Sequence, residues 1–353
     1  MLNLTTRHWV LVLLVLRFLV SSVHHQPAIA GQDLPRDPYD AVRLENDVLG
    51  VRLWGPPGQP TLSLGKSDVW DRRWFGDRQP VVTLQRLREL AKNDRLADVA
   101  ASPNGTIYDV YGKYDFPCPK PAAQVILGTP FASSARVEPD GIQAVRLTAA
   151  GHGKELVARI CVAADRSLVI VQCQAKGLRG DDLWVRIYRH RDTIVPGEPV
   201  SPTIGGQPSA KDFEQLAPPR TWQAPGQWGI LQDFPAEMTF PDGFRVVVAA
   251  TVLGPEPTIA CREGDKNLGT PLWAAQDGRL NHGVVKRYRP INEALGAAAT
   301  ARFSKLPHSF TLLLTVATTQ DGADPAAVAA QTLREAAAAL SPDGLARNQA
   351  ETL

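Results

Sequence analysis

The sequence lacks the compact motifs that usually reveal a catalytic or metal site. It has no Gly-x-Ser-x-Gly elbow for a nucleophilic serine. His190 in "IYRHRD" and His282 in "GRLNHGVVKRYRP" stand among Arg and Tyr, with no second and third ligand at a suitable spacing. We interpret both as polar residues at strand ends, and we expect neither a metal nor another cofactor.

Cysteine is also scarce, and its four copies match no zinc motif. Cys161 and Cys173 flank a predicted hairpin turn at 164–167, whereas Cys118 and Cys261 stand apart. Disulfide pairing and free thiols both remain open from the sequence.

Long apolar runs are absent beyond the first thirty residues. There, Arg7 precedes "WVLVLLVLRFLVSSV", and Ala28-Ile29-Ala30 supplies a small-x-small cleavage site. This pattern is typical of a secretory signal peptide over residues 1–30, with an uncleaved membrane anchor as the alternative. We expect cleavage near Gly31, export to the periplasm or the extracellular space, and no membrane attachment afterwards.

An excess of either charge is missing as well. The chain carries 38 basic and 36 acidic residues, a formal net charge of +2. Residues 1–30 contain Arg7 and Arg17 and no acid, so their removal lowers the net charge to 0. Because nucleic-acid affinity rests on neutralising phosphates, we expect no nucleic-acid partner.

What the sequence has instead is a series of short strand-like runs. They are rich in Val, Ile, Leu and Thr, with Gly, Pro and Asp between them. They read "GIQAVRLTA", "ELVARICVA", "SLVIVQCQA", "DLWVRIYRH", "FRVVVAATVLG" and "SFTLLLTVATT". "PDG" at 139–141 and at 241–243 predicts tight turns. We therefore predict a mainly β fold, a large antiparallel β-sandwich over residues 31–322.

Three segments depart from this pattern. Residues 83–101 have leucines at helical spacing, and the Pro- and Gly-rich residues 195–226 resemble a long surface loop. Residues 323–353 form a helical linker in our prediction, with Asp324-Pro325 at its start. Its apolar stripe comprises Ala329, Leu333, Ala336, Ala337 and Leu340.

The densest functional candidate is "LSLGKSDVWDRRW", where Asp68, Trp70, Asp71, Arg72, Arg73 and Trp74 follow a strand. Inverting glycoside hydrolysis needs two carboxylates about 6.5–9.5 Å apart, one with a raised pKa. The neighbouring Lys and Arg residues oppose that rise, so ion pairing that fixes the turn is the preferred interpretation. The indoles then serve an interface or a sugar contact. Trp222 and Trp228 are further candidates, either stacking on sugars or pinning the long loop.

"LENDVLGVRLWGPPGQPTLSLGKSDVWDRR" (residues 44–73) resembles the start of the N-terminal β-sandwich module of bacterial glycoside hydrolases that have an (α/α)6 catalytic barrel. The α-L-fucosidase type is the familiar example, and an uncharacterised exported subgroup is more similar still. "CPKP" at 118–121 and "FTLLLTVATTQDGADPAAVAAQTL" extend the resemblance. It implies a supersandwich that packs against a barrel, with the strand exit at Asp68–Trp74 facing that barrel.

The family's barrel helices, which carry its catalytic acids, have no counterpart before Leu353. We therefore expect a non-catalytic module that packs on a barrel and contacts oligo- or polysaccharide. The barrel is then either supplied in trans or lost by truncation. The alternatives are half of a split hydrolase and a free-standing polysaccharide-binding module. A free-standing module should cover the apolar stripe of its terminal helix with its own sandwich, whereas a half-enzyme should leave it open.

Overall fold

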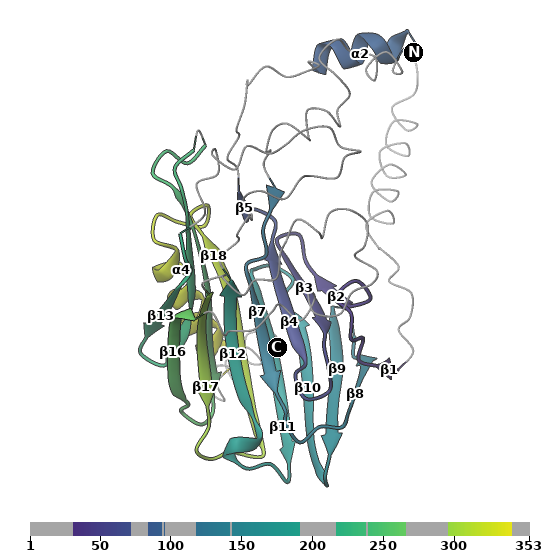
Figure 1. The fold of residues 1–353 in the computed structure, drawn as a ribbon, viewed down its shortest axis with the longest axis vertical. Helices are drawn as coiled ribbons and strands as arrows, with labels where there is room; N and C mark the ends of the chain where they lie inside the picture. Colours follow the sequence, from purple (N-terminus) through teal and green to yellow (C-terminus); the bar gives the residue numbers. More distant parts are fainter. Residues whose placement is uncertain are drawn as a thin grey trace, which may run out of the picture.

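The computed structural model describes residues 31–71, 84–93, 95, 118–141, 143–190, 217–237, 239–265 and 296–340. The predicted signal peptide and the residues after Leu340 lie outside this part of the chain. The described residues form two antiparallel sheets packed face to face, as the alternating sequence pattern predicts (Figure 1). The β-sandwich prediction is therefore confirmed.

Nine of the described strands form the larger sheet, sheet A, in the order β1-β8-β9-β10-β11-β18-β15-β14-β13. Their bounds are β1 Gln32–Asp33, β8 Ser134–Pro139, β9 Ala144–Gly151, β10 Lys154–Val162, β11 Leu168–Lys176, β18 Ser309–Thr318, β15 Phe244–Leu253, β14 Gln227–Phe234 and β13 Arg220–Ala224. Each run that the sequence analysis identified within these bounds is a strand. The last strand, β18, lies in the middle of the sheet.

Seven described strands form the second sheet, sheet B, in the order β16-β17-β12-β7-β4-β3-β2. They are β16 Thr258–Asp265, β17 Gly296–Arg302, β12 Trp184–His190, β7 Ala123–Gly128, β4 Thr61–Lys66, β3 Leu49–Trp54 and β2 Val42–Glu45. A short pair, β5 (Trp70–Asp71) with β6 (Cys118–Pro119), continues beyond the exit of β4. A 3-10 turn, η2 (Gly180–Asp182), precedes β12.

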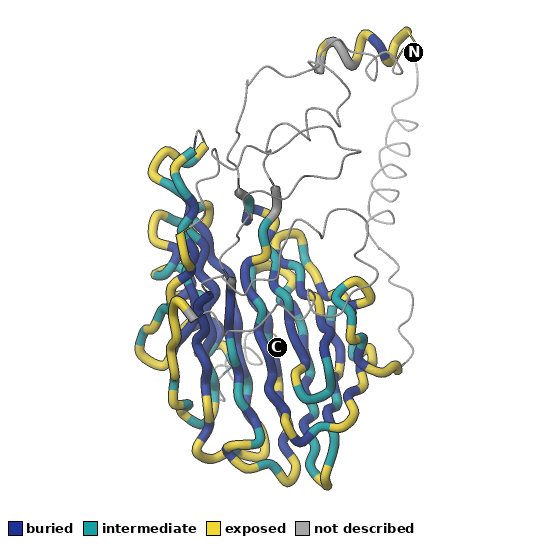
Figure 2. Tube along the Cα trace, viewed as in Figure 1, coloured by how far each residue is buried: buried dark blue, intermediate teal, exposed yellow. Residues whose placement is uncertain are grey.

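The core lies between the sheets, because strands place alternate side chains on opposite faces. Leu62 and Leu64 of β4 belong to the same buried cluster as Leu312, Leu314 and Val316 of β18. Figure 2 shows the buried residues running along both sheets, with exposed residues gathered at the turns. The Asn46 amide adds a polar link between the sheets, donating to Ala163 O (2.6 Å) and Arg166 O (2.9 Å).

The terminal helix α4 (Pro325–Leu340) lies on the outer face of sheet A, against β18 and β15 (Figure 1). Asp324 caps it as predicted, accepting hydrogen bonds from Ala326 N (3.0 Å) and Ala327 N (3.2 Å). Ala329, Leu333 and Ala336 are buried against sheet A. The sandwich thus covers most of the predicted stripe of this helix.

The structure confirms the predicted turns, describes part of the predicted helix over 83–101 and corrects the predicted loop over 195–226. Gly141 (φ 106°) and Gly243 (φ 89°) adopt the left-handed backbone of tight turns, as the two "PDG" sequences predict. The helix expected over 83–101 is described as α2 (Leu84–Lys92), whereas residues 96–101 lie outside the described part. The long-loop interpretation of 195–226 is wrong at its end. Residues 220–224 form β13, because β14 offers a free edge to pair with.

Two of the cysteines face opposite sides of sheet A. Cys173 points into the core, and Cys161 of the adjacent strand points outward and pairs in register with Ile170. A hairpin disulfide between them is therefore excluded, and Cys161, Cys173 and Cys261 are free thiols. Burial raises the pKa of Cys173 to about 12, and burial also raises that of Cys161. Among the described helices, none has the length and hydropathy needed to cross a membrane.

Candidate functional site

The strand exit identified in the sequence contains a buried ionic cluster. Lys66, the last residue of β4, points between the sheets, and its Nζ lies 2.7 Å from Asp68 Oδ2 and 3.1 Å from Asp321 Oδ1. Thr318, at the end of β18, donates its hydroxyl to Asp68 Oδ2 and accepts a hydrogen bond from Lys66 Nζ at 3.4 Å. We call these four residues the strand-exit cluster.

The strand-exit cluster joins the two sheets at one end of the core. Lys66 and Asp68 are each only 8% exposed, and Asp321 Oδ2 also accepts from the backbone N–H of Thr318 at 2.7 Å. A buried charge is retained at low cost only where it is paired and hydrogen-bonded, as it is here. Asp68 is thus committed to internal contacts and offers little surface to a ligand.

The other candidates of this stretch separate into two groups. Trp70 is half-buried, and its indole N–H donates to Ser67 O at 2.8 Å. Asp71 lies in β5, but its side chain is outside the described residues, as are Arg72, Arg73 and Trp74. The described part of this stretch therefore presents one partly exposed indole beside a buried ion pair.

The two tryptophans of the second candidate pair occupy different layers. Trp228, 1% exposed, belongs to the core between the sheets. Trp222 is half-buried on the outer face of sheet A, where it packs against the cluster under α4. The structure thus brings neither to an open ligand surface, and both pin their strands to the sandwich.

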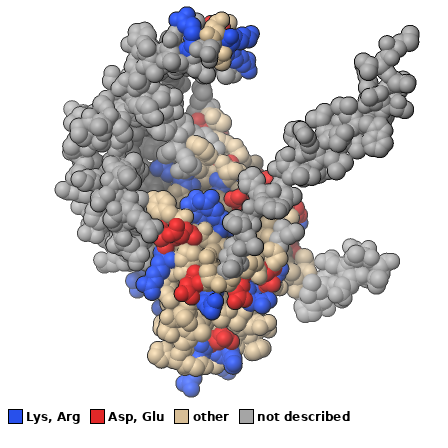
Figure 3. All heavy atoms as spheres, turned by 90° about the vertical axis from the view of Figure 1, so that its right-hand side faces the viewer, with Lys and Arg blue, Asp and Glu red and all other residues tan. Residues whose placement is uncertain are grey.

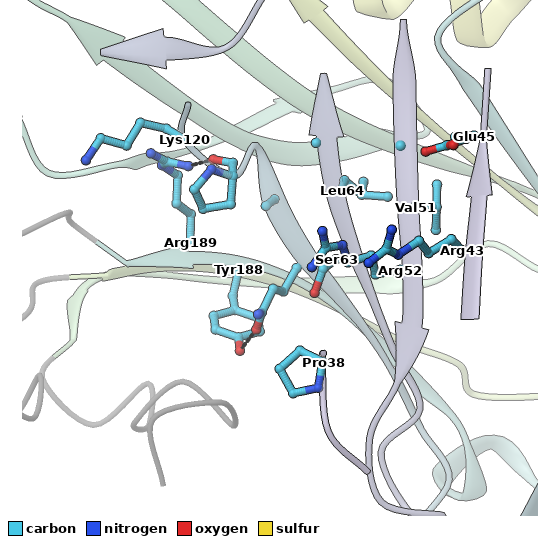
Figure 4. Close-up of a pocket in the computed structure, with 15 residues that line it drawn as sticks. Pro38, Arg43, Glu45, Val51, Arg52, Ser63, Leu64, Lys120, Tyr188 and Arg189 are labelled. Atoms are coloured by element: carbon cyan, nitrogen blue, oxygen red, sulfur yellow. Dashed lines mark hydrogen bonds between the residues drawn. The ribbon is translucent and has the colours of Figure 1, made fainter. Parts of the chain in front are cut away.

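A separate feature, which the sequence analysis did not identify, lies on the outer face of sheet B. Fifteen described residues from β2, β3, β4, β7, β12 and the adjoining loops line a hollow of about 630 Å³ (Figure 4). We call it the outer hollow. Its volume falls in the range of small-molecule sites, about 300–1,000 Å³.

Two glycines form part of the floor of the outer hollow. Gly50 of β3 and Gly65 of β4 lie directly opposite each other. A Cβ atom at Gly65 would meet no atom within 4 Å, and one at Gly50 would meet only Gly65 O at 3.8 Å. Neither glycine has the left-handed backbone that requires its residue type. The fold therefore tolerates side chains at both positions, and the space above them stays open.

Two arginines lie beside this floor. Arg43 of β2 and Arg52 of β3 are direct cross-strand partners, both exposed. Figure 4 shows their side chains extending over the outer face of the sheet. Like charges directly opposite each other in a sheet destabilise it. With the described residues, Arg52 forms no hydrogen bond or ion pair that would offset this repulsion.

Hydrogen-bonded polar groups continue the same row across the sheet. Arg52 is followed in register by Ser63, Gln124 and Tyr188. The Tyr188 hydroxyl donates to Gln124 Oε1, and Ser63 Oγ accepts from the indole of Trp54 at 2.8 Å. Burial raises the pKa of Tyr188 above its ordinary value, so it remains a neutral phenol. These contacts hold the Gln124 amide and the Ser63 hydroxyl in fixed positions at the surface.

Further positive charge lies at the end of the hollow near β6. Lys120 is half-buried there, and the buried guanidinium of Arg189 donates to Pro121 O, to Ala122 O (3.2 Å) and to Gln232 Oε1 (3.2 Å). The described lining thus contains four basic residues and one acid, Glu45. By contrast, acidic and basic side chains are interspersed over the sandwich surface that Figure 3 shows.

Part of this site could have been predicted from the sequence. Arg43 and Arg52 are the polar members of two "V-R-L" triplets, in adjacent strands that alternate buried and exposed residues. The short turn between them sets their register, so a hairpin analysis of residues 42–66 would have placed both arginines, and Gly50 and Gly65, on one face. Gln124 and Tyr188 gave no such signal, because their strands pair over long sequence distances.

Comparisons with known proteins assign no family to this chain. No family model and no curated protein matches the chain. A solved protein described as a kojibiose phosphorylase from the human microbiome aligns with a TM-score of 0.30 and 8% identity, over 87% of this chain. A 4-alpha-glucanotransferase from Thermococcus litoralis aligns with a TM-score of 0.27 and 11% identity, over 82% of this chain. The chain spans 34% and 40% of their lengths, and both TM-scores are too low to establish a shared fold.

Proposed function

We propose that this chain is a non-catalytic, carbohydrate-binding β-sandwich module whose ligand occupies the outer hollow. The observation that carries the proposal is the bare glycine floor, which leaves backbone exposed beside fixed polar groups. One face of a pyranose ring fits against such a floor, and amide, hydroxyl and guanidinium groups suit sugar hydroxyls. The resemblance of residues 44–73 to glycoside-hydrolase sandwich modules supports the same ligand class, and the apolar segment within residues 1–30 supports export.

The number of carboxylates in the described lining of the hollow favours binding over hydrolysis. Glycoside hydrolysis uses a pair of carboxylic acids on either side of the scissile bond. Glu45 is the one acid among the described residues that line the hollow. Asp68 is held by Lys66 and Thr318 at the strand exit and does not line the hollow. A single carboxylate supplies an acceptor for sugar hydroxyls but does not make up the pair that inverting or retaining hydrolysis uses.

The terminal helix favours a self-contained module over one half of a split hydrolase. The stripe of α4 is covered by its own sandwich, with Ala329 and Leu333 fully buried. Its exposed face carries Gln331, Arg334 and Glu335, which hydrogen-bond one another. An apolar surface awaiting a barrel is therefore not presented by the described part of this helix.

Packing against a barrel remains a second candidate, at the strand exit. The half-buried Trp70 lies there on β5, and the strand-exit cluster fixes the chain that leads to it. An amphipathic indole held by one hydrogen bond is suited to a protein interface. This contact and the outer hollow involve different residues, so both functions are compatible in one module.

A floor-filling substitution tests binding in the outer hollow. Gly65→Val places a β-branched side chain in open space, so the protein should fold and gain about 0.5–1 kcal/mol from losing a strand glycine. We expect isothermal titration calorimetry with an oligosaccharide panel to show binding by the parent and a loss of at least about tenfold in Gly65→Val.

Thr148→Val is the matched control, since Thr148 lies on the outer face of sheet A. It should bind like the parent. No binding by the parent to any saccharide, or equal binding by Gly65→Val, contradicts the proposed function.

A further inference from the structure

We propose that the saccharide bound in the outer hollow is acidic, with its carboxylate or sulfate group held between Arg43 and Arg52. This inference rests on the proposed function and adds the chemical class of the ligand. It follows from three observations on the described residues: the charge balance of the lining, the placement of the two arginines, and the open floor beside them.

The charge balance separates this surface from the rest of the chain. The full sequence has nearly equal numbers of basic and acidic residues. The described lining of the hollow includes Arg43, Arg52 and Lys120 against Glu45 alone, whereas the fourth basic residue of the lining, Arg189, directs its buried guanidinium to Gln232 of sheet A. A concave surface with an excess of one sign of charge concentrates oppositely charged ligands and raises their association rate.

The arginine pair supplies a geometry that suits an oxyanion. Facing residues of an antiparallel pair have Cβ atoms about 4.5–5.5 Å apart, so both guanidinium groups can reach one anion. Arginine presents a planar fork of donors that matches carboxylate and sulfate oxygens, often in a bidentate way. An anion between Arg43 and Arg52 would turn their mutual repulsion into attraction.

The open floor beside the arginines has room for the sugar ring that carries the anion. Gly50 is the next outward-facing residue along β3 from Arg52, and Gly65 faces it. A ring lying over these glycines therefore places its acid substituent toward the arginines and its hydroxyls toward Ser63 and Gln124. A bare anion site would not need this extended floor.

The test compares saccharides of equal length with different charge. Calorimetric titrations should use a uronate oligosaccharide, a sulfated oligosaccharide and a neutral one, together with inorganic sulfate. We expect an acidic oligosaccharide to bind most tightly, and its Kd to rise when the salt increases from about 50 to about 500 mM. Comparison of the uronate and the sulfated ligand distinguishes the two acid groups.

Arg52→Met removes one guanidinium but keeps an apolar stem. It should weaken acidic-saccharide binding about tenfold to hundredfold, the range for losing hydrogen bonds to a charged group. Arg302→Met is the matched control, because Arg302 is also exposed on the outer face of sheet B but does not line the hollow. It removes the same net charge and should change Kd by less than about twofold.

The outcomes separate this inference from the proposed function. Neutral saccharides that bind as tightly as acidic ones, with Arg52→Met unchanged, overturn the acidic class and leave carbohydrate binding intact. Equal affinity for inorganic sulfate and for the acidic oligosaccharides overturns the role of the sugar ring. Failure of the parent to bind any saccharide overturns both statements.

Discussion

Replacing Lys66 with Met is the sharpest test of the strand-exit cluster. Methionine keeps the length and apolar stem of the lysine, so little cavity forms. The substitution removes the ammonium group that lies 2.7 Å from Asp68 Oδ2 and 3.1 Å from Asp321 Oδ1. The two carboxylates would then share Thr318 as a hydrogen-bond partner without the neutralising cation.

The expected loss follows from burial. Lys66 and Asp68 are both almost inaccessible to water, and removing one partner of a buried pair costs about 3–5 kcal/mol. Asp321→Asn should cost less, because the Asp321 side chain is 33% exposed and water partly replaces the lost contact. Asp68→Asn should fall between these two, since an amide oxygen still accepts the Thr318 hydroxyl.

Chemical denaturation, followed by tryptophan fluorescence, measures these free energies of unfolding. The double variant of Lys66→Met with Asp68→Asn should lose less than the sum of the single variants, by about 0.5–3 kcal/mol. A loss below about 1 kcal/mol for Lys66→Met, or strict additivity in the double variant, would refute a buried, coupled ion pair joining the sheets.

Two further predictions concern the contact between Glu263 and Thr221 and the packing of α4 on sheet A. Glu263 Oε1 accepts the backbone N–H and the hydroxyl of Thr221, both at 2.5 Å, and these bonds lower the pKa of Glu263. Because the pKa of Glu263 is lower in the folded state, its stabilisation is present above the unfolded pKa and disappears as the pH falls through the folded pKa. Glu263→Gln changes an exposed group and should cost less than about 1 kcal/mol at neutral pH. In acid, the free energies of unfolding of Glu263→Gln and the parent should become equal. Leu333→Ala under α4 should cost about 2–5 kcal/mol in denaturation, whereas the exposed Arg334→Ala should stay within about 0.5 kcal/mol, and equal losses would contradict the docking of the helix.

The sequence predicts the layers of this protein because its strands and its helix keep regular periods. Runs such as "SLVIVQCQA" alternate between core and surface, and "ADPAAVAAQTL" combines a cap with an apolar stripe. These patterns predict the fold correctly because the period of a strand or helix decides which of its side chains share one face. β13, a strand within the predicted loop, is bordered by Pro219 and Pro225, which favour a loop, but its residues pair with the edge of β14.

The candidate sites were harder to predict from the sequence because they join distant parts of the chain. Asp321, one of the two carboxylates that pair with Lys66 in the strand-exit cluster, lies 255 residues away. That contact depends on β18 entering the middle of sheet A, which hydrophobic periodicity does not specify. The sequence did place Asp68 in an ion-paired turn, and the structure pairs it with Lys66, one of the three cations considered.

The outer hollow contains two features that the sandwich itself does not need. A glycine in a strand costs about 0.5–1 kcal/mol relative to alanine, yet Gly65 has neither an unusual backbone nor a close neighbour to justify it. Arginines directly opposite each other also cost stability. The buried charges of the strand-exit cluster are offset by contacts within the chain. Arg52, by contrast, forms no hydrogen bond or ion pair with the described residues, and a Cβ atom at Gly65 would meet no atom within 4 Å. An acidic saccharide would pair with Arg52 and cover the open floor at once.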